Sequence, residues 1–309
     1  MWKRYSAQHK VCPMSLLNTI HFITSHPLNK DHKFRSIIRF FKWQLGSRLV
    51  PGGVVFSWVN GSRILVQRGD TGLTGNVYCG LHEFTDMAYI LHVLDETDLF
   101  VDVGANAGSY TILACAAAGA RGYSIEPVPS TFAKLVTNVF LNKINERVEC
   151  LNLGIGEKKD RLFFTSDQNC TNHVLSQGER SEKAVGVDVV PLDDLLENEA
   201  PSAIKIDVGG YETSVIQGAR QLLSRKSLHS VIMELNGSGA RYGFDEDEIL
   251  KMMRDLGFQS YEYDPFARRL QSLKGRTSSG GNTLFLRNIK HIRERVENSP
   301  AVHVHGARI

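Results

Sequence analysis

The sequence has few cysteines, and none of them stands close to another. The five residues are Cys12, Cys79, Cys115, Cys150 and Cys170. No C-x-x-C motif occurs, so the sequence gives no indication of a zinc site or a dithiol redox pair. Scattered single cysteines fit a reducing compartment, and we expect a cytoplasmic protein.

The sequence also lacks a long apolar run and a large net charge. No segment approaches the ~18 apolar residues of a membrane span. The partly apolar stretch 14–24 is interrupted by Asn18, Thr19 and His21, which makes it a poor signal-peptide core. The formal net charge of +3 is too small to indicate nucleic-acid binding. The 309 residues suggest about two domains, or one α/β domain with an appendage.

The most informative motif lies in residues 99–110. An apolar run from Leu99 to Val103, broken only by Asp102, predicts a strand buried on both faces of a parallel sheet. A glycine turn over 104–108 follows, and then an apolar helix over 110–118. Glycines let backbone N–H groups approach a ligand, and a helix N-terminus adds donors. A second apolar strand ends in Glu126, where an acid can accept both hydroxyls of a ribose.

Two cofactor classes use this arrangement, dinucleotides and S-adenosylmethionine. The dinucleotide fingerprint is G-x-G-x-x-G, but Asn106 stands where the middle glycine is needed. A pyrophosphate requires that close backbone approach, and S-adenosylmethionine has no phosphate. We therefore favour S-adenosylmethionine over a dinucleotide and over an ordinary turn without a ligand.

Three motifs together resemble the FkbM-type methyltransferases. They are Val-Asp-Val-Gly-Ala-Asn-Ala-Gly at 101–108, Glu126-Pro127, and Ile-Lys-Ile-Asp-Val-Gly-Gly-Tyr-Glu at 204–212. The resemblance runs from about Gly80 to Asn288. It implies a class I S-adenosylmethionine-dependent enzyme that methylates a hydroxyl of a sugar, lipid or polyketide-like acceptor.

The motifs and the resemblance together predict a set of cofactor-binding residues and no metal ligand. The set is Glu83, Asp102, Gly104, Ala105, Asn106, Gly108, Glu126 and Asp207. Glu83 enters because the family often has an acid just ahead of the first strand. Its alternative is an acid favoured by the dipole at a helix N-terminus.

The fourth and fifth expected strands supply the catalytic candidates. Residues 203–208 end with Asp207, and residues 230–235 end with Glu234, followed by Asn236. Ligands of open α/β sheets bind outside such strand ends, so we expect both acids to face one crevice. Asp207 is the best candidate for a general base, or it holds the amino group of the cofactor. Alternatively, Asp207, Glu234 and Asn236 hold Mg²⁺ in a metal-assisted methyltransferase.

One position departs from the family pattern. The motif after the fourth strand usually reads Asp-Val-Glu-Gly, whereas here it reads Asp207-Val-Gly209-Gly210. If the missing acid normally acts as a base or binds the acceptor, the acceptor differs here. A further alternative is a cofactor-binding module that has lost catalysis.

Residues 1–50 form a distinct basic segment with nine cations and one acid, Asp31, and so a formal charge of +8. A helix is expected over 34–45, with an apolar face of Phe34, Ile37, Ile38, Phe41 and Leu45. We favour a helix packed on the main domain with a solvated basic face. The alternative is a weak contact with an anionic membrane surface or a phosphorylated acceptor.

Several local expectations complete the prediction. Asn60-Gly61 predicts a hairpin of strands 54–59 and 63–68. Residues 69–75 should be a loop, 148–155 a strand, and 161–165 a strand pairing with what precedes it. Ser130 should cap the helix 130–142. The polar loop 166–186 is the candidate for acceptor recognition; its His173 is either a base or merely solvated.

The expected fold is a doubly wound α/β sheet of seven mostly parallel strands, Rossmann-like, whose last strand returns antiparallel beside the fifth. The basic helical segment 1–50 and an accessory hairpin and helix in 51–95 precede a methyltransferase domain at 96–289. A basic tail at 290–309 should be frayed. The expected partner is a small-molecule, glycan or lipid-linked acceptor; the oligomeric state is left open.

Overall fold

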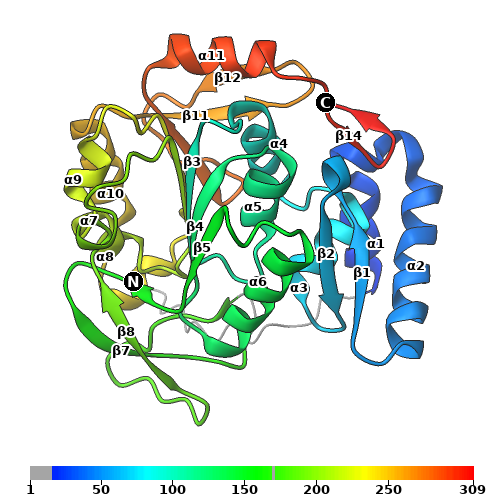
Figure 1. Ribbon diagram of the computed structural model, residues 1–309, viewed down its shortest axis with the longest axis horizontal. Helices are drawn as coiled ribbons and strands as arrows, with labels where there is room; N and C mark the ends of the chain where they lie inside the picture. The colour runs from blue at the N-terminus through cyan, green and yellow to red at the C-terminus, as the bar shows by residue number, and fades with distance from the viewer. Residues whose placement is uncertain (1–15, 169–170) are drawn as a thin grey trace, which may run out of the picture.

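The computed structural model describes residues 16–168 and 171–309, and a large mixed sheet forms its centre (Figure 1). Its eight strands lie in the order β12 (Arg269–Ser272), β11 (Gln259–Asp264), β13 (Asn282–Leu286), β10 (Ser230–Glu234), β9 (Ala203–Ile206), β3 (Leu99–Val103), β4 (Arg121–Ile125) and β5 (Val148–Leu151). From β10 to β5 every pairing is parallel. β13 pairs antiparallel with β10 and β11, and β12 pairs antiparallel with β11.

The expected α/β fold is confirmed, including the antiparallel strand beside the fifth parallel one. The sheet has eight strands rather than seven because β12 adds an edge strand. Its sequence, Arg-Leu-Gln-Ser, is largely exposed and polar, so no apolar pattern announces it. The inner strands β3 and β9 are buried at every position, as expected for strands covered on both faces.

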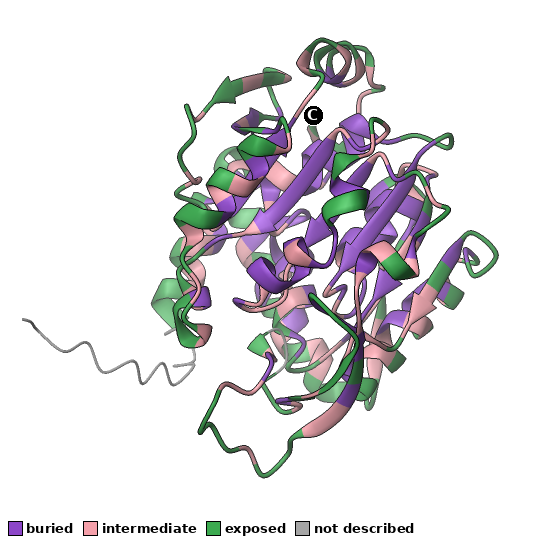
Figure 2. Cartoon of the chain, turned by 90° about the vertical axis from the view of Figure 1, so that its left-hand side faces the viewer, coloured by how far each residue is buried: buried purple, intermediate pink, exposed green. Residues whose placement is uncertain are grey.

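Helices cover both faces of the sheet (Figure 1). One layer contains α4 (Phe84–Val93), α5 (Ser109–Ile112) with the π-helical turn η3 (Leu113–Ala117), and α6 (Pro129–Leu141). The other contains α7 (Leu192–Leu195), α8 (Glu212–Gln217), α9 (Arg220–Ser224) and α10 (Glu246–Asp255). Figure 2 shows buried strands between helices whose outer sides are exposed. α8 and α9 are separate helices, and Gly218 between them packs against the backbone of Gly156.

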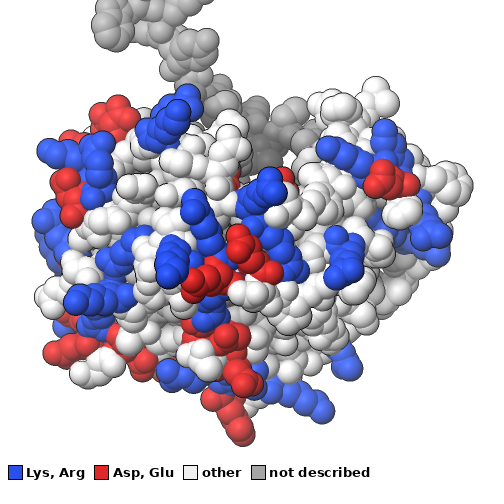
Figure 3. Space-filling view, turned by 90° about the horizontal axis from the view of Figure 1, so that it is seen from above, with Lys and Arg blue, Asp and Glu red and all other residues white. Residues whose placement is uncertain are grey.

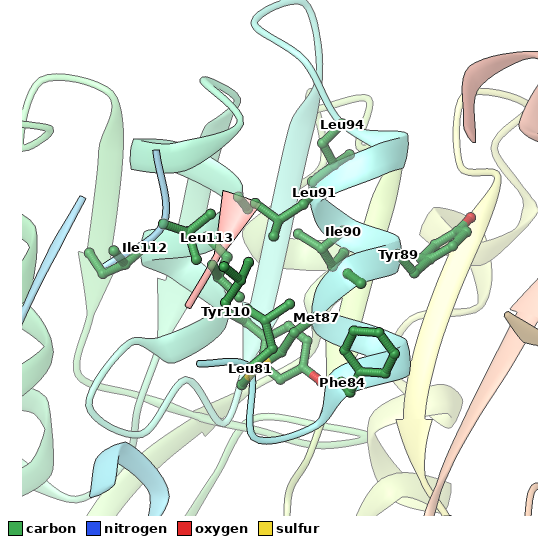
Figure 4. Close-up of a cluster of buried hydrophobic side chains, with 14 of the residues drawn as sticks. Leu81, Phe84, Met87, Tyr89, Ile90, Leu91, Leu94, Tyr110, Ile112 and Leu113 are labelled. Carbon is green, nitrogen blue, oxygen red and sulfur yellow. The ribbon is translucent and has the colours of Figure 1, made fainter. Parts of the chain in front are cut away.

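The helix α4 carries much of the core on its side of the sheet. Figure 4 shows its side chains Met87, Ile90 and Leu91 directed toward those of α5 and η3. Each fully buried Leu or Ile in such a cluster contributes about 1.5–3 kcal/mol. The cluster fixes α4 against the start of α5, next to the turn that follows β3.

A small second sheet departs from expectation. It consists of β6 (Gly154–Ile155), β8 (Val185–Val190) and β7 (Asp160–Phe164), in that order. The single strand expected over 148–155 is therefore wrong: the Asn152 side chain donates to the carbonyls of Glu126 and Pro127, and the chain leaves the main sheet there. The expected pairing of 161–165 with preceding residues is also wrong, because β7 pairs with β8, which follows it.

The N-terminal region forms a layer outside α5 and α6. It contains α1 (Leu16–Ser25), η1 (Pro27–His32), α2 (Lys33–Leu49), β1 (Gly53–Ser57), η2 (Val59–Gly61), β2 (Arg63–Gln67) and α3 (Thr71–Cys79). The hairpin is confirmed, with left-handed backbone at Asn60 and Gly61. The loop expected at 69–75 is wrong: buried Leu73 and Val77 pack α3 on its neighbours despite its glycines.

The expected packing face of α2 is wrong. The buried residues are Ser36, Phe40 and Trp43, whereas Phe34, Phe41 and most of the expected apolar face are exposed. α2 has two apolar faces, and the spacing of its apolar residues does not show which of them packs on the protein. The part of the basic-segment prediction that concerns Lys3, Arg4 and Lys10 lies outside the described residues, as do Cys12 and Cys170.

Two asparagines, one in α6 and one directly after it, hold the hairpin on the main domain. Asn142 accepts from the Arg63 amide and donates to its carbonyl, at 2.8 and 2.7 Å. Asn138 accepts from the Leu65 amide and donates to the carbonyl of Ala107, at 2.7 and 2.8 Å. The expected Ser130 cap is wrong, because α6 starts at Pro129 without a side-chain cap.

The C-terminal residues are ordered rather than frayed. They form α11 (Ile289–Asn298) and a hairpin of β14 (His303–Val304) and β15 (Ala307–Arg308). Val302, Val304 and Ile309 are buried. These apolar residues, at short intervals in a basic stretch, are the sequence signal for the packed C-terminus. A membrane-crossing helix, which must be long and continuously apolar, does not occur in residues 16–168 and 171–309.

Candidate active site

A cavity of about 410 Å³ opens at the carboxyl ends of the parallel strands, within the range of small-molecule sites. It brings together nearly all of the residues predicted from the sequence. These are Glu83, Asp102, Gly104, Ala105, Asn106, Glu126, Asp207 and Glu234. Gly108 does not line the cavity; it precedes α5 in left-handed conformation.

Position 104 requires a glycine because of its backbone conformation and its close neighbour. Its φ is +80°, and a Cβ built there would lie 1.8 Å from the carbonyl oxygen of Asp207. We expected the glycine to admit a ligand, but the close approach is to the end of β9. The glycine thus locks the turn after β3 against the strand that carries Asp207.

The backbone amides of the turn after β3 are all hydrogen-bonded within the protein. All five backbone N–H groups from 104 to 108 have an acceptor inside the protein. The pairs are Gly104 and Ala105 with the Ile125 carbonyl at 2.9 Å, Asn106 with Glu126 Oε2 at 2.9 Å, Ala107 with Asn106 Oδ1 at 2.7 Å, and Gly108 with the Ala105 carbonyl at 2.8 Å. A pyrophosphate cradle needs amides directed at the ligand, so this turn does not suit one.

Glu126 is buried at the end of β4, against the turn. Its Oε1 accepts from the Val128 amide and its Oε2 from the Asn106 amide, both at 2.9 Å. Burial raises the pKa of Glu126 to about 7, and the two backbone hydrogen bonds work against that rise. Each carboxylate oxygen has a second lone pair, so Glu126 can still accept from a ligand hydroxyl.

Asp102 lies on the floor of the cavity. Its Oδ2 accepts from the Thr111 hydroxyl at 2.6 Å, and that hydroxyl also contacts the Ser124 hydroxyl at 2.8 Å. Burial raises the pKa of Asp102 to about 6. Asp102 thereby ties β3 to the start of α5 and to β4.

Lys205 is a functional candidate that our sequence reasoning missed. Its side chain is 1% exposed, and Nζ lies 3.0 Å from Asp207 Oδ2 and 3.3 Å from Asn282 Oδ1. Burial lowers the pKa of Lys205, but the charge of Asp207, followed by nearby acids, outweighs it and raises the pKa overall. The signal was available: a lysine between isoleucines of a buried strand needs carboxylates close by.

Glu83 stands at the start of α4 but does not cap it. Its Oε2 accepts from the Tyr110 hydroxyl at 2.6 Å, and the ring centre of Tyr110 lies 5.2 Å from Lys205 Nζ. Figure 4 shows Tyr110 between α4 and α5, close to Met87. Glu83 therefore faces the cavity and belongs to the charged network around Lys205.

Glu234 is the last residue of β10, Asn236 follows the strand, and both lie at the cavity wall. Burial and the neighbouring Asp207 raise the pKa of Glu234 to about 8. Asn236 Oδ1 turns back to accept from the Ser238 amide at 3.0 Å. The donor set does not fit the metal-assisted alternative: Lys205 already supplies a cation to Asp207, and Asn236 is engaged in a local turn. No metal-ligating group of three or more His, Cys, Asp or Glu occurs among the described residues.

The polar loop 166–186, of which 169–170 lie outside the described residues, reaches the cavity. Thr171, Asn172 and His173 line it. His173 is buried rather than solvated, and its ring nitrogens contact the Thr171 carbonyl and Glu179 Oε1, both at 3.0 Å. With both nitrogens engaged, His173 is poorly placed to act as a base.

Gly209 lies under this loop. Its φ is +61°, and a Cβ there would lie 3.1 Å from Cβ of His173. The absence of a side chain at 209 lets the loop approach β9. A glutamate at this position would be strained by the positive φ, and residues 172–173 would have to move by a few tenths of an ångström.

Comparisons with known proteins identify the family of this chain. The sequence model of the FkbM methyltransferase domain matches residues 102–260. Hexuronic acid methyltransferase AglP from Haloferax volcanii is 26% identical over 169 residues, which cover 54% of this chain and 65% of that protein. The chain thus matches just under two thirds of that relative's length.

Solved structures give only distant likenesses. The precorrin-6y C5,15-methyltransferase of Geobacter metallireducens has a TM-score of 0.38 at 11% identity, covering 67% of this chain and 86% of that chain. A putative rRNA methylase of Clostridium thermocellum has a TM-score of 0.41 at 12% identity, covering 65% and 90%. Nothing about the function of this chain is inferred from these two structures. The family match spans the turn at 104–108, most of the residues that line the cavity and more than half of the sequence, and the chain belongs to the FkbM methyltransferase family.

Proposed function

We propose that this methyltransferase moves a methyl group from S-adenosylmethionine to a hydroxyl of an acidic sugar. The observation that carries the cofactor assignment is the acidic cavity beside a turn with no amide left for a phosphate, and Arg241 at the cavity wall carries the assignment of an acidic acceptor. Five carboxyl groups line this cavity, against two permanent cations, Lys205 and Arg241.

The residues fit S-adenosylmethionine better than a dinucleotide. Its sulfonium and amino groups are cationic and suit a carboxylate-rich site, which would repel a pyrophosphate. Glu126 is placed to accept from the ribose hydroxyls. Asp207, at the end of β9, is placed near the amino group or the reacting centre.

The bound cofactor supplies an electrophilic methyl carbon. The protein must hold an acceptor oxygen in line with that carbon at about 3–3.5 Å. As the new C–O bond forms and the C–S bond breaks, the hydroxyl proton passes to a carboxylate. Glu234 is suited to this task, since its pKa of about 8 lies near neutral pH; Asp207 is the second candidate. Lys205 positions Asp207 through their ion pair.

The acceptor side is formed by the loop near His173 and by Tyr211, Ser238 and Arg241. Arg241 is exposed at the cavity wall, where its planar guanidinium can bind a carboxylate with two hydrogen bonds. Because the curated relative is named for hexuronic acid, we propose a uronic acid, free or within a glycan, as acceptor.

The surface charges and the free thiols bear on the partners and the location of the protein. Figure 3 shows Lys and Arg interspersed with Asp and Glu over one face of the molecule, so we propose that nucleic acid is not a partner. The free thiols Cys79, Cys115 and Cys150 support a cytoplasmic location. We propose that 96–289 is the catalytic domain, that α4 completes its helical layer, and that the layer formed by 16–79 buttresses it.

Labelled S-adenosylmethionine with uronic and neutral sugar acceptors tests the proposal. We expect transfer to uronic acids, abolished in Asp207→Asn. Arg241→Gln should raise KM for uronic acids at least about tenfold, as expected for a lost charged hydrogen bond, and leave neutral sugars unaffected. Equal rates on both acceptor classes, or an unchanged KM in Arg241→Gln, would contradict the acidic-sugar assignment.

A further inference from the structure

The outer face of α2 is an apolar surface that does not belong to the cavity. Nine of the twelve exposed large hydrophobic side chains in the described chain fall within residues 16–55. Five of these recur along α2 at intervals of three or four residues and so share one face of the helix. This outer stripe consists of Phe34, Ile38, Phe41, Leu45 and Leu49.

A different face of α2 already attaches the helix to the protein. Phe40 and Trp43 are buried, and the Phe40 ring meets the Tyr78 ring edge-on at 5.2 Å. Gln44 donates to the Tyr78 hydroxyl at 2.9 Å. At 3.6 residues per turn the buried face points away from the outer stripe. The stripe is therefore not needed to dock α2.

Basic side chains border the outer stripe on both sides. By helical geometry, Arg35 and Lys42 follow one edge of the stripe and Arg48 the other. All three are exposed, whereas Asp31 is the single acid in residues 16–50. At the right-hand end of Figure 3, where Figure 1 draws the N-terminal helices, blue and white atoms predominate.

We propose that the outer stripe of α2 binds the surface of an anionic lipid membrane, with the helix lying in the plane of the interface. Apolar side chains at the centre enter the boundary of the acyl chains while flanking cations meet anionic headgroups. A second copy of this chain fits less well, because it would bring the same cations against each other. This inference does not depend on the acceptor of the methyl group.

Vesicle co-sedimentation tests the apolar part. We expect the wild type to bind vesicles of phosphatidylcholine mixed with phosphatidylglycerol, and phosphatidylcholine alone much less. Phe41→Ser should weaken binding roughly tenfold or more, since it removes a large apolar side chain from the interface. Phe163→Ser is the matched control: Phe163 on β7 is 57% exposed and Phe41 is 53% exposed, but Phe163 lies outside α2.

The charged part has its own comparison. Replacing Arg35, Lys42 and Arg48 together by Gln should weaken binding on the order of a hundredfold at low salt. The same replacement at the exposed residues Lys158, Lys226 and Lys251 should change it little. Added salt should reduce wild-type binding. Affinity for S-adenosylmethionine and the unfolding transition should be unchanged in every variant, which shows that each one is folded.

Three outcomes would overturn the proposal. The first is a wild type that ignores anionic vesicles. The second is equal vesicle binding by Phe41→Ser and Phe163→Ser. The third is a concentration-dependent dimer that Phe41→Ser dissociates, without vesicle binding, which would assign the stripe to a second copy. Loss of methyl transfer with vesicle binding intact would bear on the proposed function alone.

Discussion

Gly104 and Gly237 have nearly the same left-handed backbone but different surroundings. Their φ angles are +80° and +84°; a Cβ at Gly104 meets the Asp207 carbonyl, and a Cβ at Gly237 meets nothing within 4 Å. We predict that Gly104→Ala destabilises by more than about 4 kcal/mol and that Gly237→Ala costs only about 1–2 kcal/mol of backbone strain. Chemical denaturation measures both. Equal costs would contradict the clash between the turn and β9.

Asn106 tolerates its left-handed φ of 50° and bonds the next amide with its side chain. We predict that Asn106→Gly changes the free energy of unfolding by about 1 kcal/mol or less, because glycine adopts this conformation readily. Asn106→Val should cost more, since a β-branched residue is strained there. Thermal unfolding of both variants checks this; a more stable valine variant would refute it.

The raised pKa of Glu234 predicts how the rate of methyl transfer depends on pH. A base must be deprotonated, and the pKa of Glu234 is raised to about 8. The rate should therefore rise from pH 6 toward about pH 8 and then level off. Glu234→Gln should be slow and should lack this rise. A wild-type profile that is flat below pH 8 would instead leave Asp207 as the base.

The sequence allowed part of the candidate site to be predicted, for a definite reason. Glu126 and Asp207 stand at strand ends, a position that can be found by counting along the chain. Lys205 and Arg241 could not be assigned in the same way, because their importance depends on which side chains the sheet brings beside them. The contact of His173 with Glu179 is local, but it lies in a loop that has no periodic pattern from which it could be predicted.

At the scale of elements, apolar patterns located strands and helices well but not their partners. The pattern of 34–45 predicted a helix, yet α2 has two apolar faces, and which one is covered depends on α3. β7 was recognised as a strand, but its pairing with β8 depends on a long connection. The frayed tail expected at 290–309 is in fact α11 and a hairpin, because tertiary packing of a few apolar residues outweighs a polar composition.

The C-terminal hairpin should make stability depend on pH through His305. Burial, helped by the nearby charge of Arg39, lowers the pKa of His305 to about 4. Below pH 6.5 the unfolded chain takes up a proton that the folded chain does not, so stability falls as the pH falls from 6.5 to 4. His305→Asn keeps a residue that tolerates the φ of 51°.

We predict that wild type loses about 1.4 kcal/mol per pH unit relative to His305→Asn across that window. Denaturation at several pH values measures the difference between the two free energies of unfolding. The contribution of the buried carboxyl groups cancels, because both proteins contain them. Parallel curves for the two proteins would contradict the burial of an uncharged His305.

At the scale of the whole molecule, a small net charge conceals segregated charges. The total is +3 and residues 1–50 contribute +8, so the remainder is acidic. Carboxyl groups concentrate in the cavity, and cations border the outer stripe of α2. The two regions suit a cationic cofactor and an anionic surface, respectively.

Calorimetric titration with S-adenosylmethionine tests the central claim most directly, with wild type, Glu126→Gln and the control Glu146→Gln at an exposed acid. We predict one binding site, weakened at least about tenfold in Glu126→Gln because hydrogen bonds to a charged group are lost, and unchanged in the control. NAD should not compete, since the turn at 104–108 offers no amides to its pyrophosphate. An unchanged Kd in Glu126→Gln, or competition by NAD, would contradict the account.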